Sequence, residues 1–108
     1  MKKFVFVYYG GASMENTPPE DMQIVMDKWM AWFGTFKDQM VDGGNPFAPG
    51  GKAVTPKGIE VIPAEMWPAT GYTIINAKDM DEATEIAKGC PALEVDESAV
   101  RVYEAMPM

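Results

Sequence analysis

The stretch that decides the fold is KFVFVYY, residues 3–9. It is apolar on both alternations, with Phe4 and Phe6 on one side and Val5 and Val7 on the other. This pattern predicts a strand that is buried on both faces. Residues 71–77 (GYTIINA) predict a second strand of the same kind, and residues 100–105 (VRVYEA) predict the last strand.

Two helices are predicted between these strands. The first begins at Thr17-Pro18-Pro19-Glu20, where Thr17 can cap the helix and Glu20 completes a capping box. It ends at Gly43-Gly44. The second begins with an Asx cap at Asp79 and ends at Gly89. Apolar residues spaced by three and four give the first helix one wide stripe: Met22, Val25, Met26, Trp29, Trp32, Phe33, Phe36 and Met40.

A hairpin is predicted between the two helices. Residues 53–55 and 59–62 read as short strands, joined by a turn at Pro56-Lys57-Gly58. With this hairpin counted as one β segment, the order is β-α-β-β-α-β, the split ferredoxin-like pattern. The prediction is therefore an α+β chain with one domain over residues 1–108. Its four-stranded antiparallel sheet carries two helices on one face.

The count of faces predicts a homodimer. Two helices can cover only one face of a four-stranded sheet, yet residues 3–9 and 71–77 are apolar on both alternations. A second copy, packed sheet to sheet, is the simplest cover for the remaining face.

Composition excludes several classes of protein. Nine basic and sixteen acidic residues give a net charge of −7, which argues against nucleic acid and anionic membranes as partners. No apolar run approaches the ~20 residues that span a bilayer. The apolar run at residues 4–9 is too short for a secretory signal, and the single cysteine fits a reducing compartment, so we expect a cytoplasmic protein.

The absence of histidine limits the chemistry further. It excludes Ser-His-Asp and Cys-His catalysis and any imidazole ligand. With Cys90 as the single cysteine, a zinc site is improbable, and no calcium or phosphate loop is visible. We expect no cofactor and no metal, and Cys90 reads as a structural thiol.

Short motifs in a fixed order give the chain a resemblance to a known family. They are KFVFVY (3–8), PEDM (19–22), GG (43–44), GYTII (71–75), DEA (81–83), GCP (89–91) and VRVYE (100–104). In this order they resemble the YCII-related family, including its DGPF-domain branch. The resemblance implies a ferredoxin-like fold that pairs as a dimeric α+β barrel. The His–Asp pair suggested as catalytic in the YCII branch cannot exist here, and PAEM (63–66) stands where the DGPF signature is expected.

Seven residues are candidates for binding a ligand. Arg101, the only arginine, shares an alternation with Tyr103 and could anchor a carboxylate; the alternative is a surface or interface arginine paired with an acid. Trp29 and Trp32 could line an apolar pocket or belong to the core. The remaining candidates have hydroxyl or amide groups that could face a cavity or bind backbone: Tyr8, Tyr72 and Asn76.

These residues favour one function and leave two alternatives open. The favoured function is a homodimer that binds a small apolar or aromatic acid in a pocket between sheet and helices. One alternative, implied by the resemblance to related barrels, is a histidine-free lyase or isomerase that uses a carboxylate or a tyrosine. The other, implied by relatives fused to transcription-related domains, is a protein-interaction module linked to regulation. A cavity that holds Arg101 and a tyrosine would favour the first two, and a solid interior the third. No catalytic residue is assigned.

Overall fold

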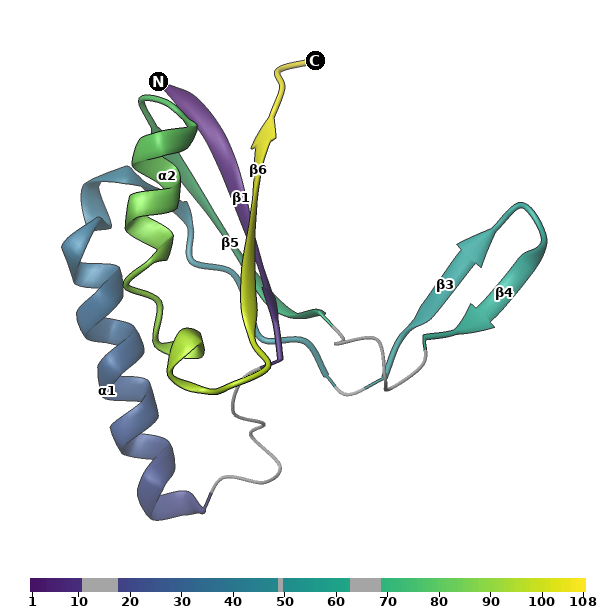
Figure 1. Cartoon of the computed structure of the whole chain (residues 1–108), viewed down its shortest axis with the longest axis horizontal. Coiled ribbons are helices and arrows are strands. Elements are labelled where there is room, and N and C mark those ends of the chain that lie inside the picture. Colours follow the sequence, from purple (N-terminus) through teal and green to yellow (C-terminus); the bar gives the residue numbers. More distant parts are fainter. Residues whose placement is uncertain (11–17, 49, 63–68) are drawn as a thin grey trace.

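The computed structural model describes residues 1–10, 18–48, 50–62 and 69–108. Its helices and strands, with η marking 3₁₀ helices, are β1 (Lys2–Tyr9), α1 (Pro19–Thr35), η1 (Lys37–Gln39), β2 (Met40–Asp42), β3 (Lys52–Thr55), β4 (Gly58–Val61), β5 (Ala69–Ala77), α2 (Met80–Ala87), η2 (Pro91–Glu94) and β6 (Ala99–Ala105). Four strands form an antiparallel sheet in the order β2-β5-β1-β6, and both helices lie on one side of it (Figure 1). The predicted α+β, ferredoxin-like architecture is confirmed.

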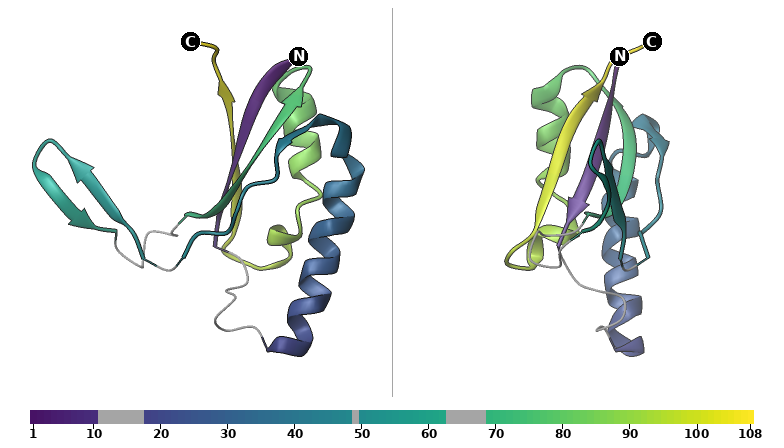
Figure 2. Two further views of the ribbon diagram at one scale, coloured as in Figure 1. Left: turned by 180° about the vertical axis from the view of Figure 1, so that it is seen from behind. Right: turned by 90° about the vertical axis from the view of Figure 1, so that its right-hand side faces the viewer.

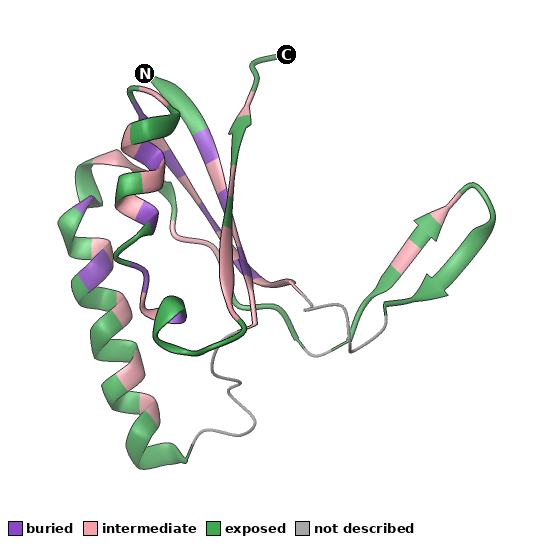
Figure 3. Cartoon of the chain, viewed as in Figure 1, coloured by how far each residue is buried: buried purple, intermediate pink, exposed green. Residues whose placement is uncertain are grey.

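The core lies between the sheet and the helices. Phe4, Phe6 and Ile75 are fully buried on the side of β1 and β5 that faces α1 and α2. Figure 3 shows the buried residues gathered in these strands and in the helices that cover them. The other alternation, which includes Val5 and Val7, is only half-buried. The prediction that both faces are buried is thus correct for one face within a single copy.

The first helix is shorter than predicted. Thr17, the expected cap, lies outside the described residues, and α1 begins at Pro19 with no side-chain cap. The helix ends at Thr35 rather than at Gly43, because Met40 leaves the helical stripe to pair with Ile75 in the sheet. Strand pairing there gives the backbone groups at the outer edge of β5 their hydrogen-bond partners. The stabilisation from this pairing outweighs the local preference of the sequence for helix.

The hairpin exists, but it is not part of the main sheet. β3 and β4 form their own two-stranded sheet, with Val54 opposite Ile59. The fourth strand of the main sheet is β2, which the sequence pattern had assigned to the end of the helix. Figures 1 and 2 show the hairpin projecting away from the sheet, on the side opposite the helices.

The second helix follows the prediction closely. The Asp79 carboxylate accepts a hydrogen bond from the backbone N–H of Glu82 at 2.9 Å, which caps α2 as expected. After the helix, Gly89 lies against the ring of Trp32, and a side chain there would crowd that ring. Pro91 then opens η2. None of the helices in the described ranges is both long and apolar enough to cross a bilayer.

Candidate functional site

The seven candidate residues do not lie on one face. Strand pairing places Arg101 opposite Val7 and Tyr103 opposite Val5, so both point away from the helices. Tyr8 has the other alternation and faces α1. The sheet therefore separates the candidates into two groups: Tyr8, Trp29 and Trp32 on the helix side, and Tyr72, Asn76, Arg101 and Tyr103 on the open side.

On the helix side, the aromatic residues pack against each other. The ring centroids of Tyr8 and Trp29 are 5.0 Å apart, those of Trp29 and Trp32 are 5.6 Å apart, and edge-to-face geometry prevails. The indole N–H of Trp32 donates to the carbonyl of Ile86 at 3.0 Å. These contacts belong to a packed core, which was the alternative interpretation of the two tryptophans.

Tyr8 is bound within the same core. Its hydroxyl donates to Oγ1 of Thr73 at 2.6 Å, and Thr73 in turn donates to the carbonyl of Gly43 at 2.9 Å. Burial raises the pKa of Tyr8 and the hydrogen bond with Thr73 lowers it. The effect of burial is larger, so the pKa lies well above its ordinary value. The hydroxyl is thus a neutral structural group whose hydrogen bond is already formed.

The predicted pocket that joins Arg101 to a tryptophan is therefore wrong in its geometry. A ligand anchored by Arg101 cannot rest on Trp29 or Trp32, because the sheet stands between them. The reason is the register of β6, which pairs Arg101 with Val7 rather than with a residue that faces the helices.

The open face, as we call the uncovered side of the sheet, carries a cluster of one cation and two aromatic rings, formed by Arg101, Tyr9 and Tyr103. The guanidinium carbon of Arg101 lies 4.5 Å from the ring centroid of Tyr9, in cation–π geometry. Arg101 is exposed and forms no ion pair with any described carboxylate. The side chain of Tyr103, followed by that of Tyr9, favours the charged form and raises the pKa of Arg101.

Apolar side chains surround this cluster. Val5, Val7 and Ile74 are half-buried on the same alternation of the central strands. Tyr72 stacks on Phe47 with ring centroids 5.9 Å apart and planes 28° apart. Asn76 lies further along β5, opposite Lys3. A fixed cation amid aromatic rings suits an anionic ligand with an apolar body.

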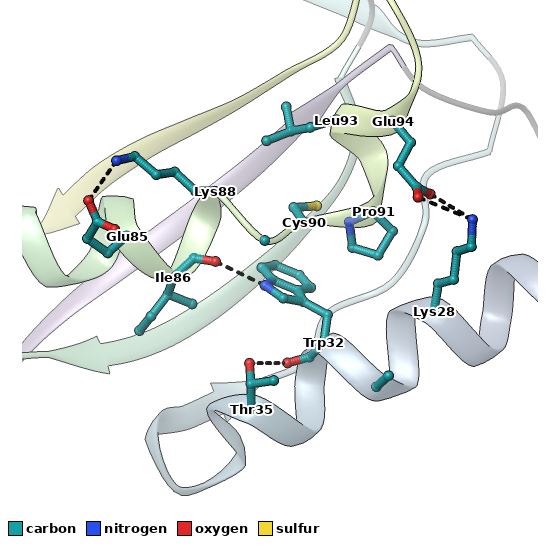
Figure 4. A pocket seen from close by; sticks show the side chains of 12 residues that line it. Lys28, Trp32, Thr35, Glu85, Ile86, Lys88, Cys90, Pro91, Leu93 and Glu94 are labelled. Atoms are coloured by element: carbon teal, nitrogen blue, oxygen red, sulfur yellow. Dashed lines mark hydrogen bonds and ion pairs between the residues drawn. The ribbon is translucent and has the colours of Figure 1, made fainter.

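An open groove lies elsewhere, between α1, α2 and η2. It has a volume of about 730 Å³ and is shown in Figure 4. Its charged side chains pair with each other, Lys28 with Glu94 at 3.2 Å and Lys88 with Glu85 at 2.7 Å. Of the seven candidates only Trp32 lines it. Sequence reasoning missed this groove, because its walls come from two segments, residues 28–35 and 85–94, that lie far apart in the chain.

Cys90 lines the groove but offers no nucleophile. The residue is 3% exposed, and burial raises the pKa of its thiol to about 12. A neutral thiol is a poor nucleophile. Across the ranges that the structure describes, no three His, Cys, Asp or Glu side chains are grouped to hold a metal ion.

Comparisons with known proteins support the fold. No protein-family model matches the chain, and no curated protein matches it. Its structure is similar to that of 5-chloro-2-hydroxyhydroquinone dehydrochlorinase (TftG) from Burkholderia phenoliruptrix AC1100, in complex with 2,5-dihydroxybenzoquinone. The TM-score is 0.51 at 16% identity, over 95% of this chain and 93% of that chain. At this identity the similarity shows the fold alone. It supports the fold that the YCII-related resemblance implied, while membership of that family stays a prediction.

Proposed function

We propose that the chain is a homodimer that binds a small aromatic acid between the open faces of two sheets. The observation that carries this proposal is the position of Arg101. The only arginine of the chain stands on an uncovered, largely apolar sheet face, next to Tyr9 and Tyr103 and without a described carboxylate partner. In this proposal the ligand lies on the opposite side of the sheet from the pocket predicted from sequence.

The dimer is supported by the apolar character of that face. Val5, Val7 and Ile74 are half-buried and Tyr103 is 50% exposed, and no helix among the described residues lies over them. A two-fold axis would bring the same face of each copy together. Packing the two faces would then remove this apolar surface from water, which drives association.

The anionic ligand is supported by what such packing does to charge. Each copy would bring its own Arg101 into the shared interface. Taking two guanidinium groups out of water without a counter-charge is costly. A carboxylate can neutralise them and accept paired hydrogen bonds from a guanidinium, while its aromatic body lies against the tyrosine rings. The ligand site is thus incomplete in one copy.

The first test is mass. Light scattering at micromolar concentration should give about twice the 11.9 kDa of one chain. A monomer at every accessible concentration would refute the proposal, because the described part of one copy encloses no site on this face.

The second test is ligand-dependent stability. The probes are benzoate and 2,5-dihydroxybenzoquinone, the second because it is bound by the dehydrochlorinase of similar fold. A ligand at a hundred times its Kd stabilises the folded state by about 2.7 kcal/mol, which a thermal shift detects. We expect this shift in the wild type and in the control Lys88→Gln, which removes a cation from the groove, but not in Arg101→Gln. Equal shifts in wild type and Arg101→Gln would remove Arg101 from the site.

Lyase-like chemistry is a second candidate for the same face. One observation favours it: the structure of similar fold is a dehydrochlorinase. A Tyr103 hydroxyl beside a guanidinium could transfer a proton to a bound ligand. Turnover of 5-chloro-2-hydroxyhydroquinone by wild type, lost in Tyr103→Phe with binding retained, would support this candidate. Binding of this compound without turnover would reject the lyase candidate and support the function of a binding protein.

A further inference from the structure

The hairpin of β3 and β4, which we call the arm, exposes an unusual amount of aliphatic surface. Pairing of Val54 with Ile59 and of Lys52 with Val61 puts these side chains on one face of the arm. The exposed fractions are 80% for Val54, 70% for Ile59 and 75% for Val61. Side chains of this kind, clustered and exposed on one element, mark a surface that a partner covers.

The arm is also a weak structure by itself. It has only two strands of four residues each, and it stands apart from the four-stranded sheet (Figures 1 and 2). Isolated two-stranded hairpins are marginally stable in water, because they have no second layer to pack on. Packing its aliphatic face against another surface would supply that layer.

The direction of the arm identifies the partner. Figure 2 shows the arm leaving one end of the sheet on the side opposite the helices, which is the side of the open face. A second copy packed on the open face would therefore lie beside the arm. Two-fold symmetry would give it an arm in return, so that each copy is flanked by the other's arm.

Charge supports the same partner. The arm contains two basic residues, Lys52 and Lys57, and one acidic residue, Glu60, so its net charge is +1. The whole chain has a net charge of −7, so the rest of it carries −8. A positive arm is attracted to the acidic body of another copy and not repelled by it.

We propose that the arm clasps a second copy of this chain, with Val54, Ile59 and Val61 packed on the partner subunit. This rests on the homodimer of the proposed function and adds the element that strengthens its interface. The arm then acts by setting the dimer affinity, and the ligand site on the open face forms only where that affinity is sufficient.

The experiment compares the two faces of the arm. Val54→Thr with Ile59→Thr keeps residues that favour strands but replaces aliphatic groups by polar ones. The matched control, Ala53→Ser with Glu60→Asp, keeps the charge of the arm and changes a cross-strand pair on the opposite face. Sedimentation equilibrium on the full chain should show at least a tenfold weaker dimer for the first pair and a change under twofold for the control.

The outcomes separate this proposal from the proposed function. If the wild type is a dimer and Val54→Thr with Ile59→Thr leaves its affinity unchanged, the proposed contact of the arm with the partner is wrong. The homodimer itself would then still be supported. A wild type that is monomeric throughout would overturn both. Hydrogen exchange gives a second measurement that needs no variant: residues 52–62 should exchange more slowly in the dimer than in the diluted monomer. Equal exchange in the two states would overturn the clasp.

Discussion

The buried hydrogen-bond chain from Tyr8 through Thr73 to Gly43 gives the sharpest test of the core. Tyr8 is 5% exposed and Thr73 is fully buried. The bond from Thr73 to the Gly43 carbonyl ties the chain just after β2 to β5, so this small network holds the edge of the sheet.

Substitution of the two residues should have very unequal effects. Tyr8→Phe removes one hydroxyl and leaves Thr73 bonded to Gly43, which should cost about 1 kcal/mol. Thr73→Val leaves both the buried Tyr8 hydroxyl and the Gly43 carbonyl without their partner, which should cost about 3 kcal/mol at the usual penalty per unsatisfied group.

The double variant decides whether this reasoning is right. With Thr73→Val already present, Tyr8→Phe removes a buried hydroxyl that has lost its partner, so it should restore about 1 kcal/mol. The assay is urea unfolding followed by circular dichroism, at one fixed protein concentration because association affects stability. Simple additivity, with the double variant about 4 kcal/mol less stable than wild type, would refute the network as described.

Substitutions at two further positions test the groove side. Gly89→Ala places a methyl group 3.2 Å from Cδ1 of Trp32, which should displace the ring. We expect the free energy of unfolding to fall by about 1–2 kcal/mol, with a lower melting temperature and changed tryptophan fluorescence. An unchanged fluorescence spectrum would contradict this. Burial raises the pKa of Cys90 from 9.0 to about 12, so its contribution to stability is full below pH 9 and declines as the pH rises toward 12. The fall in urea midpoint from pH 8 to pH 10 should be smaller in Cys90→Ala, and Cys90→Ser should retain ligand binding.

Local patterns predicted most of the main elements. Alternating apolar residues located β1, β5 and β6 to within about two residues, and the Asp79 cap located α2. These signals work because side-chain alternation and helix capping depend on neighbours in the sequence. The shared alternation of Arg101 and Tyr103 was likewise predicted from their spacing alone.

The sequence failed where two patterns competed. Met40 continues the helical spacing of α1, yet it lies in β2. Nothing local distinguishes the two states, because the preference comes from pairing with Ile75, which is 35 positions away. The same applies to the hairpin: its turn was predicted correctly, but its separation from the main sheet was not.

The sequence by itself therefore determined the elements, the ferredoxin-like order and the existence of an apolar face that two helices cannot cover. Only the tertiary structure decided which residues share a face. Spacing within β6 puts Arg101 beside Tyr103, but the register of β6 against β1 decides that both look away from Trp32. Alternation has a period of two, so a register shift of one residue would turn every side chain of that strand to the opposite face. That choice is made by contacts between distant segments.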